Sequence, residues 1–208
     1  MKEKFYIDFD STLFDSSKYL HKLYVICEKY KISRTELDEI TDSIFEHHKN
    51  FFIDDLLKYL IEEKKVDKNI KEDFKILENT SFLYEDSILF LKNIQNKYNL
   101  ILLTCGNISN QQKKIDACDI KKYFSNIIIT PGNKSTVQEV EYQNSIFLDN
   151  NPKEVERFVS VGAKRVIRIK RDTDKYSKIP LKINGIEEYS SLYEVLEGLG
   201  IKQDEYLL

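Results

Sequence analysis

The stretch KFYIDFDSTL, residues 4–13, carries the most information in this 208-residue sequence. Its aromatic and β-branched first half is typical of a short buried strand, which we expect to end at Asp8. Asp10 follows two positions later, so in an extended chain the two carboxylates project from the same side. This pair of carboxylates has two possible interpretations: it is part of a cation-binding site, or it consists of ordinary turn residues where a strand ends and a loop begins.

The second half of the chain alternates between apolar runs and amphipathic segments. Pro152 suits the first turn of a helix because its φ is fixed and it has no N–H to leave unpaired. Strands alternating with helices predict an α/β fold with a parallel sheet and helices on both faces. The expected strands are residues 99–104, 126–130, 145–149 and 164–169, and the expected helices include residues 109–117, 135–140, a segment starting at 152 and a last segment with apolar positions at 192–199.

A long helical segment separates the first strand from the second. Its apolar residues recur at helical spacing, as in Leu20, Leu23 and Cys27, so the helices must bury these faces against each other. We therefore expect residues 16–80 to form a helical insertion, and residues 1–15 and 81–208 to form the α/β core. The aromatic residues of the insertion are expected to be mostly its own core: Tyr19, Tyr24, Tyr30, Phe45, Phe51, Phe52 and Tyr59.

Composition excludes several classes of function. The sequence has 32 Lys and Arg against 35 Asp and Glu, a net charge of −3. It therefore lacks the excess of basic residues expected of a protein that binds nucleic acid. The longest apolar runs are far shorter than the ~18 residues of a membrane span, and no signal-peptide pattern opens the chain. We expect a cytoplasmic protein with no membrane partner and with three free cysteines, because they lack a paired spacing. The basic pairs Lys113-Lys114 and Lys170-Arg171 are expected to be solvated.

Polar residues stand where three of the expected strands end. Asp8 and Asp10 follow the first strand, Thr104 ends the second, and Asp149 and Asn150 end the strand at 145–149. Functional residues in open parallel sheets gather beyond the carboxyl ends of the strands. Clustered carboxylates need a compensating cation, and oxygen ligands without His or Cys favour Mg²⁺.

Taken together, these residues resemble the motifs of the haloacid dehalogenase superfamily of aspartate-nucleophile phosphohydrolases. The segment from Asp8 to Leu13 is similar to the first motif and Thr104 to the second. Lys134 stands in the place of the third motif, and the pair Asp149-Asn150 resembles the fourth. The resemblance covers nearly the whole chain and implies a Rossmann-like core, with the insertion at 16–80 in the position of the superfamily's helical cap.

The resemblance also implies a role for each motif residue. Asp8 would be the nucleophile that forms an aspartyl-phosphate, and Asp10 the general acid and base. Thr104 and Lys134 would bind the phosphoryl group. Mg²⁺ would be held by Asp8, by Asp10 through its backbone carbonyl, and by the pair Asp149 and Asn150.

Some of these assignments leave alternatives open. Thr104 is also compatible with an ordinary strand-end Thr, and Lys134 with a solvated surface lysine. Ser11 stands where superfamily members often have Gly. Asn150 stands where the fourth motif usually offers a carboxylate, which leaves open whether Asp149 or Asn150 binds the metal directly.

The expected function is a Mg²⁺-dependent phosphatase that acts on a small phosphorylated metabolite, such as a nucleotide or a sugar phosphate. Asp10 favours phosphate esters over organohalides, because a halide leaves as an anion and needs no proton. A helical cap favours small substrates, since it closes over the site. The alternatives are a phosphomutase of the same superfamily and a non-catalytic phospho-binding or regulatory protein on this fold.

Overall fold

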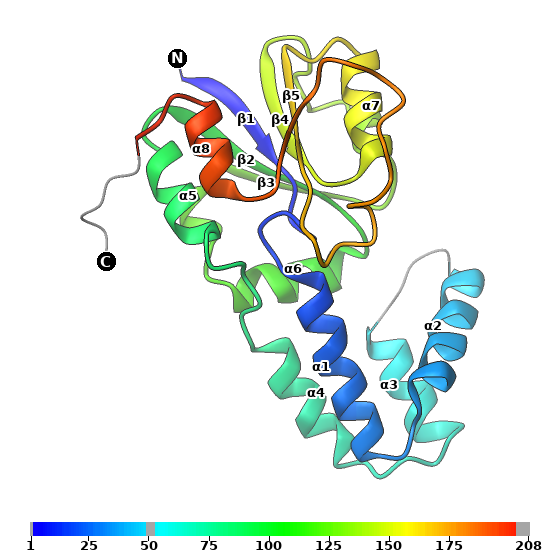
Figure 1. Cartoon of the computed structure of the whole chain (residues 1–208). Helices are drawn as coiled ribbons and strands as arrows, with labels where there is room; N and C mark the ends of the chain where they lie inside the picture. The colour runs from blue at the N-terminus through cyan, green and yellow to red at the C-terminus, as the bar shows by residue number, and fades with distance from the viewer. Residues whose placement is uncertain (1, 49–52, 203–208) are drawn as a thin grey trace.

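A six-stranded parallel sheet forms the centre of the larger lobe in the computed structural model, which describes residues 2–48 and 53–202 (Figure 1). The strand order is β3-β2-β1-β4-β5-β6, and every neighbouring pair is parallel. The strands are β1 (Glu3–Ile7), β2 (Tyr98–Cys105), β3 (Asn126–Thr130), β4 (Ser145–Asp149), β5 (Arg165–Ile169) and β6 (Glu187–Tyr189).

The two faces of the sheet bury two separate apolar clusters. In β1, Phe5 and Ile7 belong to one cluster and Tyr6 to the other, as the two-residue period of a strand requires. On the second face the ring of Phe147 stacks on Tyr6 at a centroid distance of 4.9 Å and on Phe158 at 4.4 Å. Burial on both faces explains why these strands read as nearly continuous apolar runs.

Helices cover both faces. On the first face, apolar residues of α5 (Ser87–Ile94), α6 (Ile108–Ala117) and α8 (Leu192–Gly198) join the cluster of Phe5 and Ile7. On the second face lies α7 (Pro152–Ser160), which contributes Val155 and Phe158. Helix α7 begins at the proline, as predicted, and the Asn151 side chain accepts a hydrogen bond from the Lys153 amide as its N-cap.

The remaining helices form a second lobe beside the sheet (Figure 1): α1 (Ser16–Lys29), α2 (Arg34–His48), α3 (Ile53–Glu62) and α4 (Ile70–Glu78). The two chain segments that join this lobe to the core run next to each other. The Asp15 amide donates to the Phe82 carbonyl at 2.7 Å, and the Tyr84 amide donates to the Leu13 carbonyl at 2.9 Å. The two chain segments that connect the lobe to the core are therefore paired with each other.

The parallel α/β sheet confirms the predicted fold class. Several features differ from the expectations. The helix expected at 135–140 is a single 3-10 turn, η2 (Lys134–Thr136), and the strand β6 was not predicted because its sequence, Glu187-Glu188-Tyr189, lacks an apolar pattern. Leu20, expected on the buried stripe, is 44% exposed. The expectation for Phe51 and Phe52, and for the side chain of Phe45, lies outside the described residues.

The three cysteines are free, as expected. None of the helices in residues 2–48 and 53–202 combines the length and the apolar character that crossing a membrane requires.

One buried ion pair ties several segments of the core together. Arg171 donates to both carboxylate oxygens of Asp86, at 2.7 and 2.8 Å, and to the Thr12 carbonyl at 3.0 Å. Asp86 also accepts from the amide of Leu192 at 2.9 Å. The expectation that Arg171 is solvated was wrong, since only 7% of it is exposed. The pair therefore joins the loop after β1 to the starts of α5 and α8.

We expect Asp86→Ala to lower the free energy of unfolding by about 3–5 kcal/mol, because it leaves the Arg171 guanidinium buried without its carboxylate. Urea denaturation at neutral pH measures the change. Lys75→Met is the matched control: Lys75 lies 3.9 Å from Glu72 in a pair whose side chains are 70% and 75% exposed. Its loss should cost less than about 1 kcal/mol. Equal losses of unfolding free energy in the two variants would contradict the stabilising role of the buried Asp86–Arg171 pair.

Candidate active site

The site lies at the point where the strand order reverses. From β1 the chain moves outward through β2 and β3, then returns to the other side of β1 with β4 and continues through β5 to β6. Open parallel sheets have a crevice at such a switch point, beyond the carboxyl ends of the strands. Asp8 directly follows β1 and Asp149 ends β4, so these two acids flank the crevice.

The loop after β1 holds Asp8 in place through its backbone. The Asp8 amide donates to the Leu148 carbonyl at 2.9 Å, which continues the ladder between β1 and β4. The Thr12 hydroxyl donates to Asp8 Oδ2 at 3.0 Å. Ser11 adopts a φ of +56°, a left-handed conformation that favours glycine. This backbone conformation is a physical reason for Gly to be common at this place in the resembled motif.

Lys134 lies between the two acids. Its ammonium group donates to Asp8 Oδ1 and, at 2.7 Å, to Asp149 Oδ2, and only 4% of the residue is exposed. The hydroxyl of Tyr142 shares its single proton between the carbonyl of Lys134 at 2.8 Å and that of Val137 at 2.9 Å. A tyrosine thus holds the turn that carries the lysine, and the solvated alternative for Lys134 does not apply.

The electrostatics show an excess of negative charge around Asp8. Burial raises the pKa of Asp8 to about 7; Asp149 and Asp10 raise it as well, while Lys134 opposes the shift. Burial would lower the pKa of Lys134, but the carboxylates of Asp149 and Asp8 raise it above its usual range. Because a single ammonium group contacts the two carboxylates of Asp8 and Asp149, an added cation would be stabilised there.

Thr104 and Asp10 are joined through a helix that follows β2. The side-chain amide of Gln111, on α6, donates to Thr104 Oγ1 at 2.9 Å and to Asp10 Oδ2 at 2.6 Å. Lys114, one turn later on α6, donates to Asp10 Oδ1, and so does the Ser16 hydroxyl at 3.0 Å. Lys114 was expected to be solvated, which was wrong: its side chain is only 18% exposed.

These contacts determine the charge state of Asp10. Burial would raise its pKa, but the nearby Lys114 ammonium and the hydrogen bonds from Lys114, Gln111 and Ser16 outweigh it and lower the pKa below its usual range. In this arrangement Asp10 is a carboxylate.

Asn150 lies beside the acids and has a partner far along the sequence. Its side-chain amide donates to Asp174 Oδ2 at 2.8 Å, and both residues are buried, with 5% and 6% of their surface exposed. Asp174 was not identified from the sequence, because the polar segment between β5 and β6 has no periodic pattern that would single it out.

A cavity of about 850 Å³ opens above these residues. The sheet edge contributes Asp8, Asp10, Thr104, Lys134 and Asn150 to its lining. Helix α1 contributes Tyr19 and Leu20 from the helical lobe, and the segment after β5 contributes residues 172–178. The volume lies within the range of small-molecule sites.

The donors in this site fit Mg²⁺. Asp8, Asp149 and Asn150 carry carboxylate and amide oxygens, which are the ligands that a hard divalent cation takes, and the resemblance implies the backbone carbonyl of Asp10 as a further ligand. Within residues 2–48 and 53–202 no three His, Cys, Asp or Glu side chains form a metal-binding group by themselves. The amide and carbonyl oxygens would therefore have to take part.

The structure brings together all the residues that the sequence singled out: Asp8, Asp10, Thr104, Lys134, Asp149 and Asn150. The sequence reasoning missed Gln111, Lys114 and Asp174. Gln111 could have been noticed because it lies seven residues after Thr104, one turn into the helix that follows the strand. No sequence pattern indicated Lys114 or Asp174.

No family model matches the sequence, and a comparison with curated proteins finds no relative. Solved structures do match. A protein assigned to the haloacid dehalogenase-like hydrolases from Burkholderia xenovorans LB400 has a TM-score of 0.74 at 15% identity, covering 93% of this chain and 94% of its own.

Two further structures extend this finding. The YfnB protein of Bacillus subtilis, assigned to the same hydrolases and bound to magnesium, has a TM-score of 0.65 at 14% identity, over 96% of this chain and 99% of its own. The L-2-haloacid dehalogenase of Xanthobacter autotrophicus has a TM-score of 0.62 at 13% identity, over the same shares. The chain therefore has the fold of the haloacid dehalogenase-like hydrolases, as the motifs predicted.

We expect Lys134→Met to lower the free energy of unfolding by about 3–5 kcal/mol in the absence of divalent ions, because it leaves two buried carboxylates without their ammonium partner. Added Mg²⁺ should recover part of this loss by binding the folded state. Urea denaturation with Mg²⁺ and with a chelator measures both effects.

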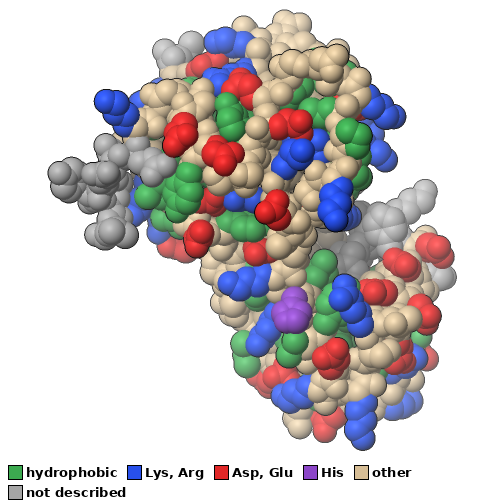
Figure 2. Space-filling model, in the orientation of Figure 1, with side chains coloured by type: hydrophobic (Ala, Val, Ile, Leu, Met, Phe, Trp, Pro, Cys, Tyr) green, Lys and Arg blue, Asp and Glu red, His purple; other side chains and the backbone are tan. Residues whose placement is uncertain are grey.

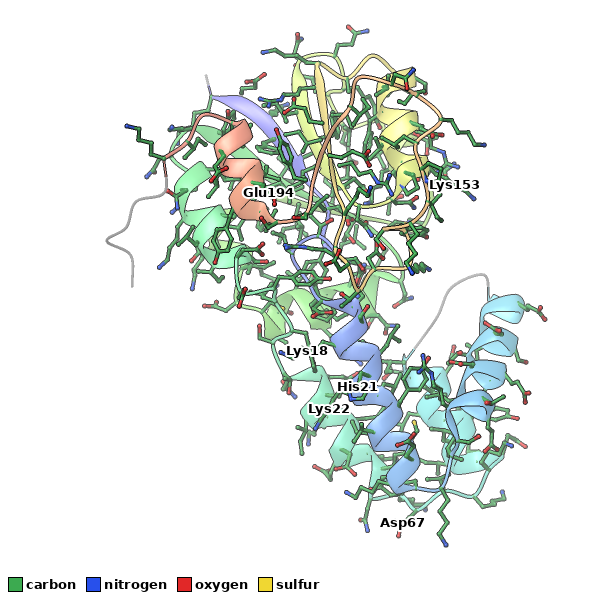
Figure 3. The ribbon with its side chains drawn as sticks, in the orientation of Figure 1. Lys18, His21, Lys22, Asp67, Lys153 and Glu194 are labelled. Atoms are coloured by element: carbon green, nitrogen blue, oxygen red, sulfur yellow. The ribbon has the colours of Figure 1, made fainter. Side chains whose placement is uncertain are left out.

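The control for this substitution is Lys153→Met, since Lys153 is an exposed residue at the outer side of α7 (Figure 3). It should leave the unfolding free energy within about 0.5 kcal/mol of the wild type. A Lys134→Met protein as stable as this control would show that Lys134 does not stabilise the buried carboxylates of Asp8 and Asp149.

Proposed function

We propose that the protein is a Mg²⁺-dependent phosphatase that hydrolyses a small phosphorylated metabolite, with nucleotides and sugar phosphates as the leading classes. The observation that supports this most is Asp8: a buried carboxylate that accepts a hydrogen bond from Lys134 and that lines one cavity together with Thr104 and Asp10. The fold of the haloacid dehalogenase-like hydrolases is consistent with a hydrolase, and the phosphate-specific part of the proposal rests on the site residues.

The first half of the proposed reaction transfers the phosphoryl group to the protein. An oxygen of Asp8 attacks phosphorus, the bond from phosphorus to the ester oxygen breaks, and the leaving oxygen takes a proton from Asp10. Thr104 donates a hydrogen bond to a phosphoryl oxygen, while Lys134 balances the charge of the nucleophile and the phosphate. Mg²⁺ held by Asp8, Asp149 and Asn150 would supply positive charge that lets the two anions approach.

The second half returns the protein to its starting state. The Asp10 carboxylate takes a proton from water, whose oxygen attacks the phosphorus of the aspartyl-phosphate. The bond between phosphorus and Asp8 breaks, and inorganic phosphate leaves. Asp10 must be protonated for the first half, so its contacts with Lys114 and Gln111 have to loosen when the substrate binds, since these contacts keep it ionised.

Two other activities, a dehalogenase and a phosphomutase, can be distinguished from the phosphatase. Asp10 favours phosphate esters over organohalides, because a departing halide needs no proton donor. A phosphomutase would return the phosphoryl group from Asp8 to a second oxygen of the substrate instead of to water. Inorganic phosphate as the product favours the phosphatase, and an isomeric phosphate ester favours the mutase.

The helical lobe is proposed to act as a cap that restricts the site to small substrates. Tyr19 and Leu20 of α1 line the cavity, and Lys113 on α6 donates to Asp54 of α3 and to Glu78 of α4, which bridges the lobe to the core. On the face shown in Figure 2, basic and acidic side chains are interspersed over both lobes, which agrees with a small-molecule substrate rather than a nucleic-acid partner. We propose that the protein works in the cytoplasm.

We expect the wild-type protein to release phosphate from p-nitrophenyl phosphate with Mg²⁺ and to stop when a chelator is added. Asp8→Asn should lower kcat by at least about 10³-fold, because it removes the nucleophile rather than a supporting contact. Phosphate release and p-nitrophenolate formation, followed together, measure the rate.

Asp119→Asn provides a matched control, because Asp119 is an exposed residue of the core that pairs with the exposed Lys122. It should retain the wild-type rate. Turnover that persists in Asp8→Asn would reject the nucleophile, and chloride release from 2-chloropropionate without phosphate release would favour a dehalogenase.

A further inference from the structure

The pair of Asn150 and Asp174 has a consequence for the metal site. An amide has one donating end and one accepting end, whereas a carboxylate oxygen can only accept. Because Asp174 Oδ2 takes the hydrogen bond at 2.8 Å, the nitrogen of the Asn150 side chain must face Asp174. The amide oxygen is then the group that Asn150 can offer to the cavity it lines with Asp8 and Asp10.

Asp174 is itself firmly positioned. Its amide donates to the Arg171 carbonyl at 2.9 Å, and its carbonyl accepts from Ser177 at 3.0 Å, so the residue lies within two consecutive turns. The fully buried Arg168 donates to the carbonyls of Tyr176 and Ile179, at 2.7 and 2.8 Å, and anchors the segment that follows. Asp174 is therefore presented to Asn150 by a fixed piece of backbone rather than by a flexible surface loop.

We infer that Asp174 is a positioning residue for the metal, which compensates for the carboxylate missing at position 150. It orients the Asn150 oxygen towards the cation and places one negative charge directly behind it. The inference rests on the proposed function, because it requires a cation between Asp8, Asp149 and Asn150. Mutation of a residue that is hydrogen-bonded to a metal ligand typically changes metal affinity about 10- to 100-fold.

The same physics predicts that the two residues can be exchanged. In the double variant Asn150→Asp with Asp174→Asn, the amide at 174 donates to the carboxylate at 150. The hydrogen bond and the total charge are conserved, and an oxygen still faces the cavity. The single variant Asp174→Asn lacks both the charge and the fixed amide orientation.

Magnesium affinity, measured without turnover, tests the inference. The melting temperature of each protein is followed by circular dichroism over a series of Mg²⁺ concentrations, which yields an apparent Kd for Mg²⁺ alone. We expect Asp174→Asn to weaken the affinity about 10-fold or more, and the double variant to bind within about threefold of the wild type. Phosphatase rates at a Mg²⁺ concentration near the wild-type Kd should follow the same order.

Asp172→Asn is the matched control. Asp172 lines the same cavity from the same segment but is exposed and forms no hydrogen bond with Asn150, so its substitution removes equal charge without the contact. Its affinity should stay near the wild type. If Asp172→Asn weakens Mg²⁺ affinity as much as Asp174→Asn does, the loss of one negative charge near the cavity explains both effects. That result would overturn the inference.

The remaining outcomes separate the two proposals. If the wild type binds Mg²⁺ and Asp174→Asn binds it equally well, the role of Asp174 is wrong while the proposed function stands. A double variant that binds as weakly as the single variant also overturns it. If the wild type itself shows no Mg²⁺-dependent stabilisation, the magnesium site fails, and both proposals fail with it.

Discussion

The buried contact of one ammonium group with two carboxylates determines the arrangement of this site. Lys134 comes from the turn before β4, Asp8 follows β1 and Asp149 ends β4, and all three are almost completely buried. None of these charges could be removed from water alone, so each requires the others. The sheet must bring the ends of β1 and β4 side by side, and Tyr142 must hold the turn of Lys134, for this contact to form.

The core elements were predictable because both faces of the sheet are covered. A strand buried on both faces must be apolar throughout, and this made β1, β2 and β4 visible in the sequence. The strand β6 lies at the sheet edge with polar residues and was not visible. The turn of Lys134 was expected as a longer helix, since a 3-10 turn of three residues leaves no periodicity to detect.

The site residues divide in a similar way. Asp8, Thr104 and Asp149 could be identified because they end apolar strands, and parallel strands bring their carboxyl ends to one edge. Lys114, Arg171 and Asp174 could not, because their positions depend on long-range contacts: each stands in a polar segment and meets its partner from another part of the chain. Lysines and arginines of this kind look like solvated surface until the fold is known.

The paired connection between the lobes has a consequence for how such a protein can change. Since the chain leaves the core at Asp15 and re-enters at Phe82, where the two segments are joined by backbone hydrogen bonds, everything between them is an insertion whose ends already meet. The insertion can lengthen, shorten or be replaced while the strand order and the ends of β1 and β4 stay as they are. Under the proposed function, substrate choice and bond-breaking chemistry would then reside in separable parts of one polypeptide.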